Sequence, residues 1–182
     1  MIFISIPKTG TISVRQSLGL NARYNHMPAK KIMNKIGSEK WNSCYSFTFV
    51  RNPYDRLVSW YFFHRDTQNI DLYKQYNFKQ WLFEGCPNHW TQKTGAETLK
   101  PLSLHDYLLD EEDNLMVDFV GRVENINRDF KSLMKEIGVS PRPLKHKNKS
   151  KRKRYQDYYD KESRAQVQKL FGKDLELFKY KF

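Results

Sequence analysis

The sequence has few of the features that mark secreted, metal-binding or membrane-spanning proteins. Its 182 residues include only two cysteines, Cys44 and Cys86, with no disulfide framework or metal-ligand spacing, which suits a reducing compartment. The histidines form no ligand-spaced pair, and apolar runs are too short to cross a bilayer. The first residues already have the composition of a β-strand. We therefore expect no signal peptide or membrane anchor, no metal, and a soluble cytoplasmic protein.

Acidic residues are also scarce relative to basic ones. The chain has 20 Asp and Glu residues against 32 Lys and Arg residues, a formal net charge of +12. This excess implies a polyanionic partner: a nucleic acid, an acidic glycan, a membrane surface or a phosphorylated cofactor. A hydrophobic content of 39% and an aromatic content of 15% predict a packed core. The length, without repeats or low-complexity linkers, predicts a single domain over residues 1–182.

The first stretch of the chain predicts an anion-binding turn. Ile2–Ile6 is short, apolar and largely β-branched, as in a buried strand, and Pro7 ends it. Gly10 allows a tight turn, and a helix is expected over Ile12–Leu18. A strand, a loop containing Lys8 and a helix together direct backbone N–H groups and an ammonium at an anion. The lysine precedes the glycine, so this is not a Walker A loop. An ordinary turn with a surface lysine is the alternative.

A second strand end carries another candidate phosphate ligand. Tyr45–Val50 is a β-rich apolar run, and Arg51 follows it directly. In open α/β sheets, ligands bind at the carboxyl ends of the strands. Ser59 lies two turns into the helix expected next, and an arginine fork with a nearby hydroxyl suits a terminal phosphate. The alternative is a structural Arg51–Asp55 ion pair with a solvated serine.

The remaining patterns predict an alternation of helices and strands. Leu104–Leu109 and Leu115–Val120 suggest two strands around an acidic turn, and residues 85–97 suggest a loop. Helices are expected over Pro28–Ile36 and Asn77–Glu84, and from Pro53 with Asn52 as N-cap. Another helix is expected around Phe130, Leu133, Met134 and Ile137 and should end at Gly138, and a last helix is expected after an Asp160 cap.

Two polar features lie outside these elements. His26 stands in the loop before the helix over Pro28–Ile36, where a lone histidine by itself says little. Pro141–Arg154 holds eight basic residues and no acidic one. Such a run is usually a solvated arm, and it can bind nucleic acid, fold over an anionic cofactor or attract a polyanionic acceptor.

With both strand ends identified, the sequence resembles sulfotransferases that use 3′-phosphoadenosine 5′-phosphosulfate (PAPS). The most similar groups are carbohydrate sulfotransferases related to the heparan sulfate 2-O and chondroitin/dermatan enzymes. The resemblance covers nearly the whole chain. It rests on a 5′-phosphosulfate loop at Pro7–Ser13, a 3′-phosphate motif at Phe49–Ser59, and the segments Asp118–Asn125, Asn148–Ser150 and Asp174–Phe182.

The resemblance implies an α/β fold of the three-layer, P-loop-like sulfotransferase type, with a central, mainly parallel sheet between helices. It implies a PAPS-dependent sulfotransferase whose acceptor is a hydroxyl group, expected on a glycan, and no specific nucleic-acid partner. Lys8 and His26, which stands where the 2-O enzymes carry a histidine, are the expected catalytic residues. The expected PAPS ligands are Lys8, Thr9, Gly10, Thr11, Ile12, Ser13, Arg51, Ser59, Lys149, Ser150 and Arg154.

The sequence departs from the Golgi members of these families in two ways. Those enzymes carry an N-terminal anchor and stem, whereas this sequence begins at its first expected strand, and the insertions expected to bind the acceptor are short. A compact microbial or viral enzyme, or a trimmed catalytic domain, fits these departures. Two other function classes stay open: a nucleotide-dependent small-molecule kinase, which should show a Walker A spacing and magnesium carboxylates, and a non-catalytic binder of nucleic acids or other polyanions.

Overall fold

The structure is a computed structural model that describes residues 1–20, 26–87, 103–140, 143–144 and 152–182. These residues divide into two compact units, each made of two chain segments. Unit 1 comprises Met1–Arg51 and Leu104–Lys149, and unit 2 comprises Asn52–Ser103 and Ser150–Phe182. In the described ranges, no helix is both long enough and apolar enough to cross a membrane.

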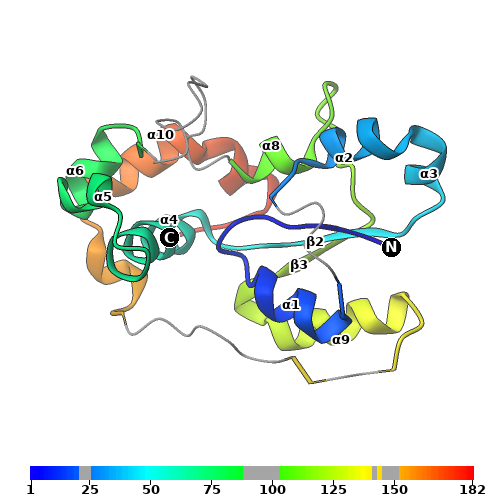
Figure 1. Cartoon of the computed structure of the whole chain (residues 1–182). Coiled ribbons are helices and arrows are strands. Elements are labelled where there is room, and N and C mark those ends of the chain that lie inside the picture. The colour runs from blue at the N-terminus through cyan, green and yellow to red at the C-terminus, as the bar shows by residue number, and fades with distance from the viewer. Residues whose placement is uncertain (21–25, 88–102, 141–142, 145–151) are drawn as a thin grey trace. The chain divides into compact units, whose positions relative to one another are not determined.

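Unit 1 is built on a three-stranded parallel sheet in the order β1-β2-β3. Its strands are β1 (Ile2–Ile4), β2 (Ser46–Val50) and β3 (Phe119–Arg122). Figure 1 shows α1 (Thr11–Leu18) and α9 (Ile126–Glu136) on one face, with α2 (Ala29–Ile36) and α8 (Leu104–Leu108) on the other. The short α3 (Ser38–Asn42) follows α2, and a 3-10 turn, η2 (Val123–Asn125), follows β3. The predicted α/β fold with a parallel sheet between helices is confirmed.

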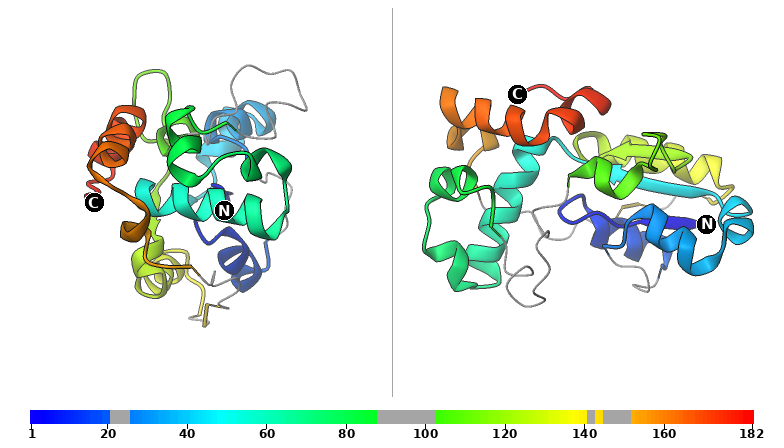
Figure 2. Two further views of the ribbon diagram at one scale, coloured as in Figure 1. Left: turned by 90° about the vertical axis from the view of Figure 1, so that its left-hand side faces the viewer. Right: turned by 90° about the horizontal axis from the view of Figure 1, so that it is seen from above.

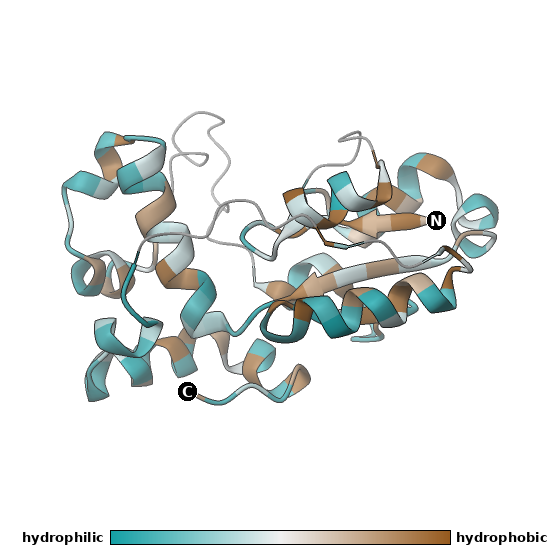
Figure 3. Cartoon of the chain, turned by 90° about the horizontal axis from the view of Figure 1, so that it is seen from below, coloured by the Kyte–Doolittle hydropathy of each residue, from teal (hydrophilic) through white to brown (hydrophobic). Residues whose placement is uncertain are grey.

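The core of unit 1 is centred on strand β2. All five of its residues are buried, because it has a strand on each side and helices on both faces. Phe47 and Phe49 pack on one face with residues of α1 and α9, among them Val14, Phe130 and Leu133. Figure 3 views the chain from below the sheet of Figure 1, and the unit 1 helices in it carry both teal and brown residues, as expected for helices with one buried face.

One predicted hairpin of unit 1 is wrong. Leu104–Leu109 was expected to be a strand, but Leu104–Leu108 forms α8. Leu104, Tyr107 and Leu108 are all buried, and their spacing of three and four residues is that of one helix face. The expected pairing is reduced to a single antiparallel bridge between Leu109 and Leu115, and the strand that follows begins only at Phe119.

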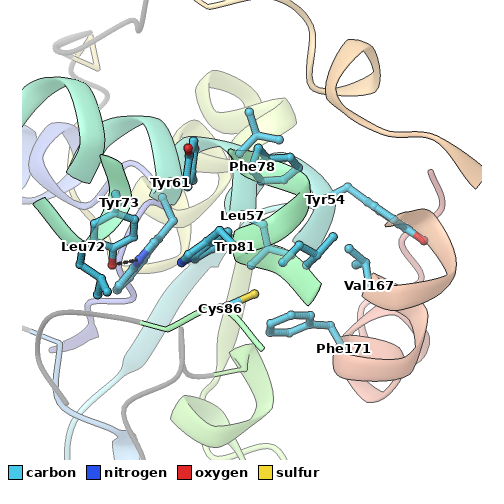
Figure 4. Packing of buried hydrophobic residues seen from close by; sticks show 13 residues of the cluster. Tyr54, Leu57, Tyr61, Leu72, Tyr73, Phe78, Trp81, Cys86, Val167 and Phe171 are labelled. Atoms are coloured by element: carbon cyan, nitrogen blue, oxygen red, sulfur yellow. Dashed lines mark hydrogen bonds between the residues drawn. The ribbon is translucent and has the colours of Figure 1, made fainter. Parts of the chain in front are cut away.

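Unit 2 is helical and is packed around aromatic side chains. It contains α4 (Pro53–Phe62), a π-helical turn η1 (Phe63–Thr67), α5 (Asp71–Lys74), α6 (Phe78–Phe83), a 3-10 turn η3 (Tyr155–Tyr158) and α10 (Lys161–Leu177). Both views of Figure 2 show α10 beside α4. Figure 4 shows Tyr61, Trp81 and Phe78 in the core, where their rings pack in edge-on and tilted arrangements, together with Val167 and Phe171 of α10.

The helix starts of unit 2 follow the sequence signals. The Asn52 side chain accepts a hydrogen bond from the Tyr54 backbone N–H, and Pro53 occupies the first turn of α4. Asp160 forms a capping box with Ser163 at the start of α10. The predicted N-caps at Asn52 and Asp160 are therefore confirmed.

We expect Gly121→Ala to destabilise unit 1. Gly121 lies opposite Phe49 in the sheet, and an added Cβ would come within 2.4 Å of the Phe49 ring, so the ring must shift in a packed core. Overpacking of this kind costs about 1–3 kcal/mol in the free energy of unfolding.

The matched control is Gly172→Ala in α10, where an added Cβ meets no atom within 4 Å. It should leave stability unchanged or raise it by up to about 1 kcal/mol. Chemical denaturation followed by circular dichroism measures both variants. Equal stabilities of Gly121→Ala and the wild type would show that the contact with Phe49 does not restrict this position.

Candidate functional site

The loop between β1 and α1 has an unusual backbone. Lys8 and Gly10 both adopt left-handed conformations, with φ of 67° and 74°. Non-glycine residues seldom occupy this region, and those that do cluster at functional sites. Gly10 is the N-cap of α1 and makes no side-chain cap bond, so the first N–H groups of the helix gain no capping side chain there. Alternating handedness beside a helix start is the geometry of an anion-binding concavity.

Two threonine hydroxyls hold this loop from inside. The Thr9 hydroxyl donates to the Ile6 carbonyl at 2.9 Å, and the Thr11 hydroxyl donates to the same oxygen at 2.8 Å. Thr9 is fully buried and Thr11 nearly so. A hydroxyl has a single proton, and in both threonines that proton is donated to the Ile6 carbonyl. In this arrangement the two side chains therefore stabilise the shape of the loop. Ser13, in the first turns of α1, is also buried.

Gly10 is enclosed from the side of α9. A Cβ added at this position would lie 2.8 Å from Cδ1 of Ile126, the first residue of α9. The site therefore requires glycine for two reasons, the positive φ and the contact with Ile126. Ile126 packs with the unit 1 core, so the helix that follows β3 fixes the loop that follows β1.

Arg51 meets the same loop from the neighbouring strand. It directly follows β2, and its Nη1 donates to the Lys8 carbonyl at 3.2 Å. The peptide bond between Lys8 and Thr9 is trans, and in a trans peptide the N–H points opposite to the carbonyl. The Thr9 N–H consequently points away from the Arg51 contact. The structure thus brings together Lys8 and Arg51, two residues of the predicted site, at the carboxyl edge of the sheet of unit 1.

His26 lies at the same end of β1. Its Nδ1 is 3.0 Å from the carbonyl oxygen of Ser5, and its own backbone is left-handed, with φ of 55°. Ser5 is buried and accepts a second hydrogen bond, since Nη2 of Arg15 lies 3.0 Å from its hydroxyl oxygen. Burial lowers the pKa of Arg15. His26 and Arg51 therefore both contact the Ser5–Lys8 stretch, which itself contains Lys8.

The other predicted site residues belong to unit 2 or lie outside the described residues. Ser59 is on α4 and is buried rather than solvated. The Asp55 carboxylate, considered above as a partner for Arg51, forms an ion pair with Arg152 of the basic run. Arg154 is exposed and lies 3.6 Å from Asp157. Lys149 and Ser150 lie outside the described residues, as does most of the predicted loop over residues 85–97.

Two further observations concern other kinds of site. In the described part of the chain, no three His, Cys, Asp or Glu side chains come together as a metal site. Unit 2 has a hollow of about 380 Å³ at the C-terminal end, lined by Tyr54, Tyr180 and Phe182 among others. It includes none of the residues predicted for the site.

Sequence reasoning missed Arg15, Ser5 and Ile126. The signal for Arg15 is its position on α1, four residues after Thr11 and so on the same helix face. Thr11 points at the loop, and Arg15 reaches the end of β1 beside it. Ser5 and Ile126 carry no sequence signal of their own, because their roles depend on contacts made across the fold.

Comparison with known proteins bears on the family to which the chain belongs. The model of a group described as "Sulfotransferase family" matches residues 1–181. An uncharacterized protein of Archaeoglobus fulgidus is 29% identical over 115 residues, which are 62% of this chain and 83% of that protein. No solved structure matches the chain significantly. The family match runs through both units and includes the β1 loop, Arg51 and Ser59. The chain therefore belongs to the sulfotransferase family.

Proposed function

We propose that the protein transfers a sulfuryl group from PAPS to an acceptor hydroxyl, expected on a carbohydrate. Family membership supports sulfotransfer in general. The observation that carries the proposal is the left-handed loop at Lys8 and Gly10, joined to Arg51 at the end of the next strand. This arrangement suits a donor with two separated phosphate groups better than one with a single anionic end.

The residues of unit 1 fit the 5′ end of such a donor. The loop offers the Thr9 N–H, the first-turn N–H groups of α1 and the Lys8 ammonium. Glycine at position 10 permits the left-handed backbone of the loop and its close packing against Ile126. In the proposal, residues 9–13 hold the 5′-phosphosulfate, and the hydroxyls of Thr9 and Thr11 hold the loop in shape.

The 3′ end of the donor is assigned to the second motif. Arg51 supplies a guanidinium, which binds phosphate in a bidentate way. The assignment of Ser59, Lys149, Ser150 and Arg154 to the donor rests on the family resemblance. Lys149, Ser150 and Arg154 belong to the basic run, whose charge suits an anionic donor.

When bound, PAPS supplies a sulfuryl group whose bond to the bridging phosphate oxygen breaks as a bond to the acceptor oxygen forms. The residues of the chain then have two tasks. Lys8 offsets the negative charge that develops on the bridging oxygen. His26 takes the proton of the acceptor hydroxyl, and since its Nδ1 faces a carbonyl, the nitrogen that does so is Nε2.

We expect loss of either catalytic residue to abolish most activity. Lys8→Ala should lower kcat about 10²- to 10³-fold, as removal of a charge-stabilising donor does. His26→Asn should lower kcat about 10²- to 10⁴-fold, the contribution of a general base. Transfer from ³⁵S-labelled PAPS to a panel of glycans, phenols and alcohols gives the rates. Lys31→Ala, an exposed lysine of α2, is the control. Full activity in Lys8→Ala or His26→Asn would disprove the corresponding role.

We expect Arg51→Ala to weaken binding of adenosine 3′,5′-bisphosphate (PAP) far more than binding of AMP. A lost charge-assisted phosphate contact corresponds to roughly 10- to 100-fold in Kd. Isothermal titration calorimetry measures both ligands, with ATP as a third. Arg128→Ala, an exposed arginine of α9, serves as control. Equal losses for PAP and AMP would contradict a 3′-phosphate role, and binding of ATP without PAP would favour a kinase.

Comparing Gly10→Ala with Gly19→Ala separates an effect on the shape of the loop from an effect on the stability of α1. Both glycines flank α1 with a left-handed φ, so each substitution costs about 1 kcal/mol of backbone strain. Only at Gly10 does an added Cβ also contact Ile126, since nothing lies within 4 Å at Gly19.

We therefore expect similar modest losses of stability from strain, with an additional loss at Gly10. PAP affinity should fall at least tenfold in Gly10→Ala and stay at the wild-type value in Gly19→Ala. Thermal unfolding and calorimetry measure the two quantities. Wild-type PAP affinity in a folded Gly10→Ala variant would show that the loop does not hold the nucleotide.

A further inference from the structure

Ser5 makes two hydrogen bonds to the groups around the proposed base. Its main-chain carbonyl lies 3.0 Å from Nδ1 of His26, and its hydroxyl oxygen lies 3.0 Å from Nη2 of Arg15. Ser5 is only 2% exposed, directly after β1. A single buried residue therefore joins a helix arginine to the ring of His26.

The direction of each hydrogen bond follows from its chemistry. A carbonyl oxygen only accepts, so the His26 Nδ1 must carry a proton in this contact. In a neutral imidazole the other nitrogen, Nε2, then holds the lone pair. Arginine has five N–H donors and no acceptor, so the Ser5 hydroxyl accepts from Arg15. Arg15 donates to Ser5, and the Ser5 carbonyl in turn accepts from His26.

The backbone indicates that this arrangement has a cost. His26 is a non-glycine residue at φ 55°, a conformation less favourable than the right-handed one. Lys8, three residues after Ser5, is left-handed as well. Strain of this kind persists where surrounding contacts determine the conformation, and at His26 one such contact is the bond to Ser5.

We propose that Arg15 and Ser5 are positioning residues that hold His26 in the tautomer with Nδ1 protonated and Nε2 unprotonated, as a base that acts on the acceptor requires. The catalytic part of this inference rests on the proposed function. Arg15 reaches Ser5 from the second turn of α1, the helix that begins at the loop of Lys8 and Gly10. The same helix therefore positions the base and presents its N-terminus at the loop.

Nuclear magnetic resonance tests the positioning without any assay of activity. In protein labelled with ¹⁵N-histidine, the two ring nitrogens of His26, assigned by their loss in His26→Asn, should show a protonated Nδ1 and an unprotonated Nε2 at neutral pH. Free histidine favours the opposite tautomer. Ser5→Ala keeps the main-chain carbonyl and loses only the hydroxyl that Arg15 holds, and Arg15→Gln weakens the same bond. Both variants should let the Ser5 carbonyl move from Nδ1 and so shift the His26 signals toward a mixture of tautomers. An Nε2-protonated ring in the wild type, or unchanged signals in both variants, would overturn the proposal.

Kinetics tests the consequence. We expect Arg15→Gln and Ser5→Ala to lower kcat roughly 10- to 100-fold while leaving the Kd for PAP within about twofold, because a charge-assisted hydrogen bond is lost away from the nucleotide. Arg15→Lys, which keeps a charged donor, should recover part of kcat. Gln16→Ala, the exposed neighbour of Arg15 on α1, is the matched control and should behave as wild type.

The two readouts separate this inference from the proposed function. If no acceptor is sulfated but the His26 tautomer changes as expected, the sulfotransfer proposal fails and the positioning holds. If the wild type is active and Arg15→Gln and Ser5→Ala retain wild-type kcat, the positioning role is wrong. Parallel falls in kcat and PAP affinity would show that Arg15 shapes the loop as a whole and would also overturn it.

Discussion

The left-handed turn between β1 and α1 is the constraint on which the rest of unit 1 depends. A turn with Lys8 and Gly10 at positive φ is unfavourable for an isolated chain, so other contacts must maintain it. Three carbonyls in and just before the turn accept hydrogen bonds from different parts of the fold: that of Ser5 from His26, that of Ile6 from two threonines and that of Lys8 from Arg51. These three carbonyls are thus used within the protein, and the amide groups of the turn are the part suited to an anion.

The sequence predicted the elements well where local and tertiary signals agree. Tyr45–Val50 is rich in aromatic and β-branched residues, and Asn52 and Asp160 are strong N-caps, so these elements were found correctly. Leu104–Leu109 was misassigned because a short apolar run fits a strand as well as a helix, and burial at Leu104, Tyr107 and Leu108 decides between them only in the fold. The identities of the site residues came from motifs and resemblance. Tertiary geometry determines that the Thr9 and Thr11 hydroxyls donate to the Ile6 carbonyl and that Arg15 contacts Ser5. The sequence alone does not reveal these contacts.

The net charge and the family assignment support each other. A charge of +12 suits a nucleotide donor with several phosphate charges, and it attracts acidic acceptors over distances of about a Debye length. Such attraction raises the rate of encounter and does not by itself select an acceptor. Selection requires contacts at the acceptor hydroxyl, and in this account the group nearest to that chemistry is His26, held through Ser5.

The most direct test of the central claim is a crystal structure of the wild-type chain with PAP. We expect the 5′-phosphate in the loop of residues 8–13, within hydrogen-bond distance of the Thr9 N–H and the Lys8 ammonium, and the 3′-phosphate on Arg51. A nucleotide bound elsewhere, or bound in the reverse orientation with its 3′-phosphate in the loop, would contradict it.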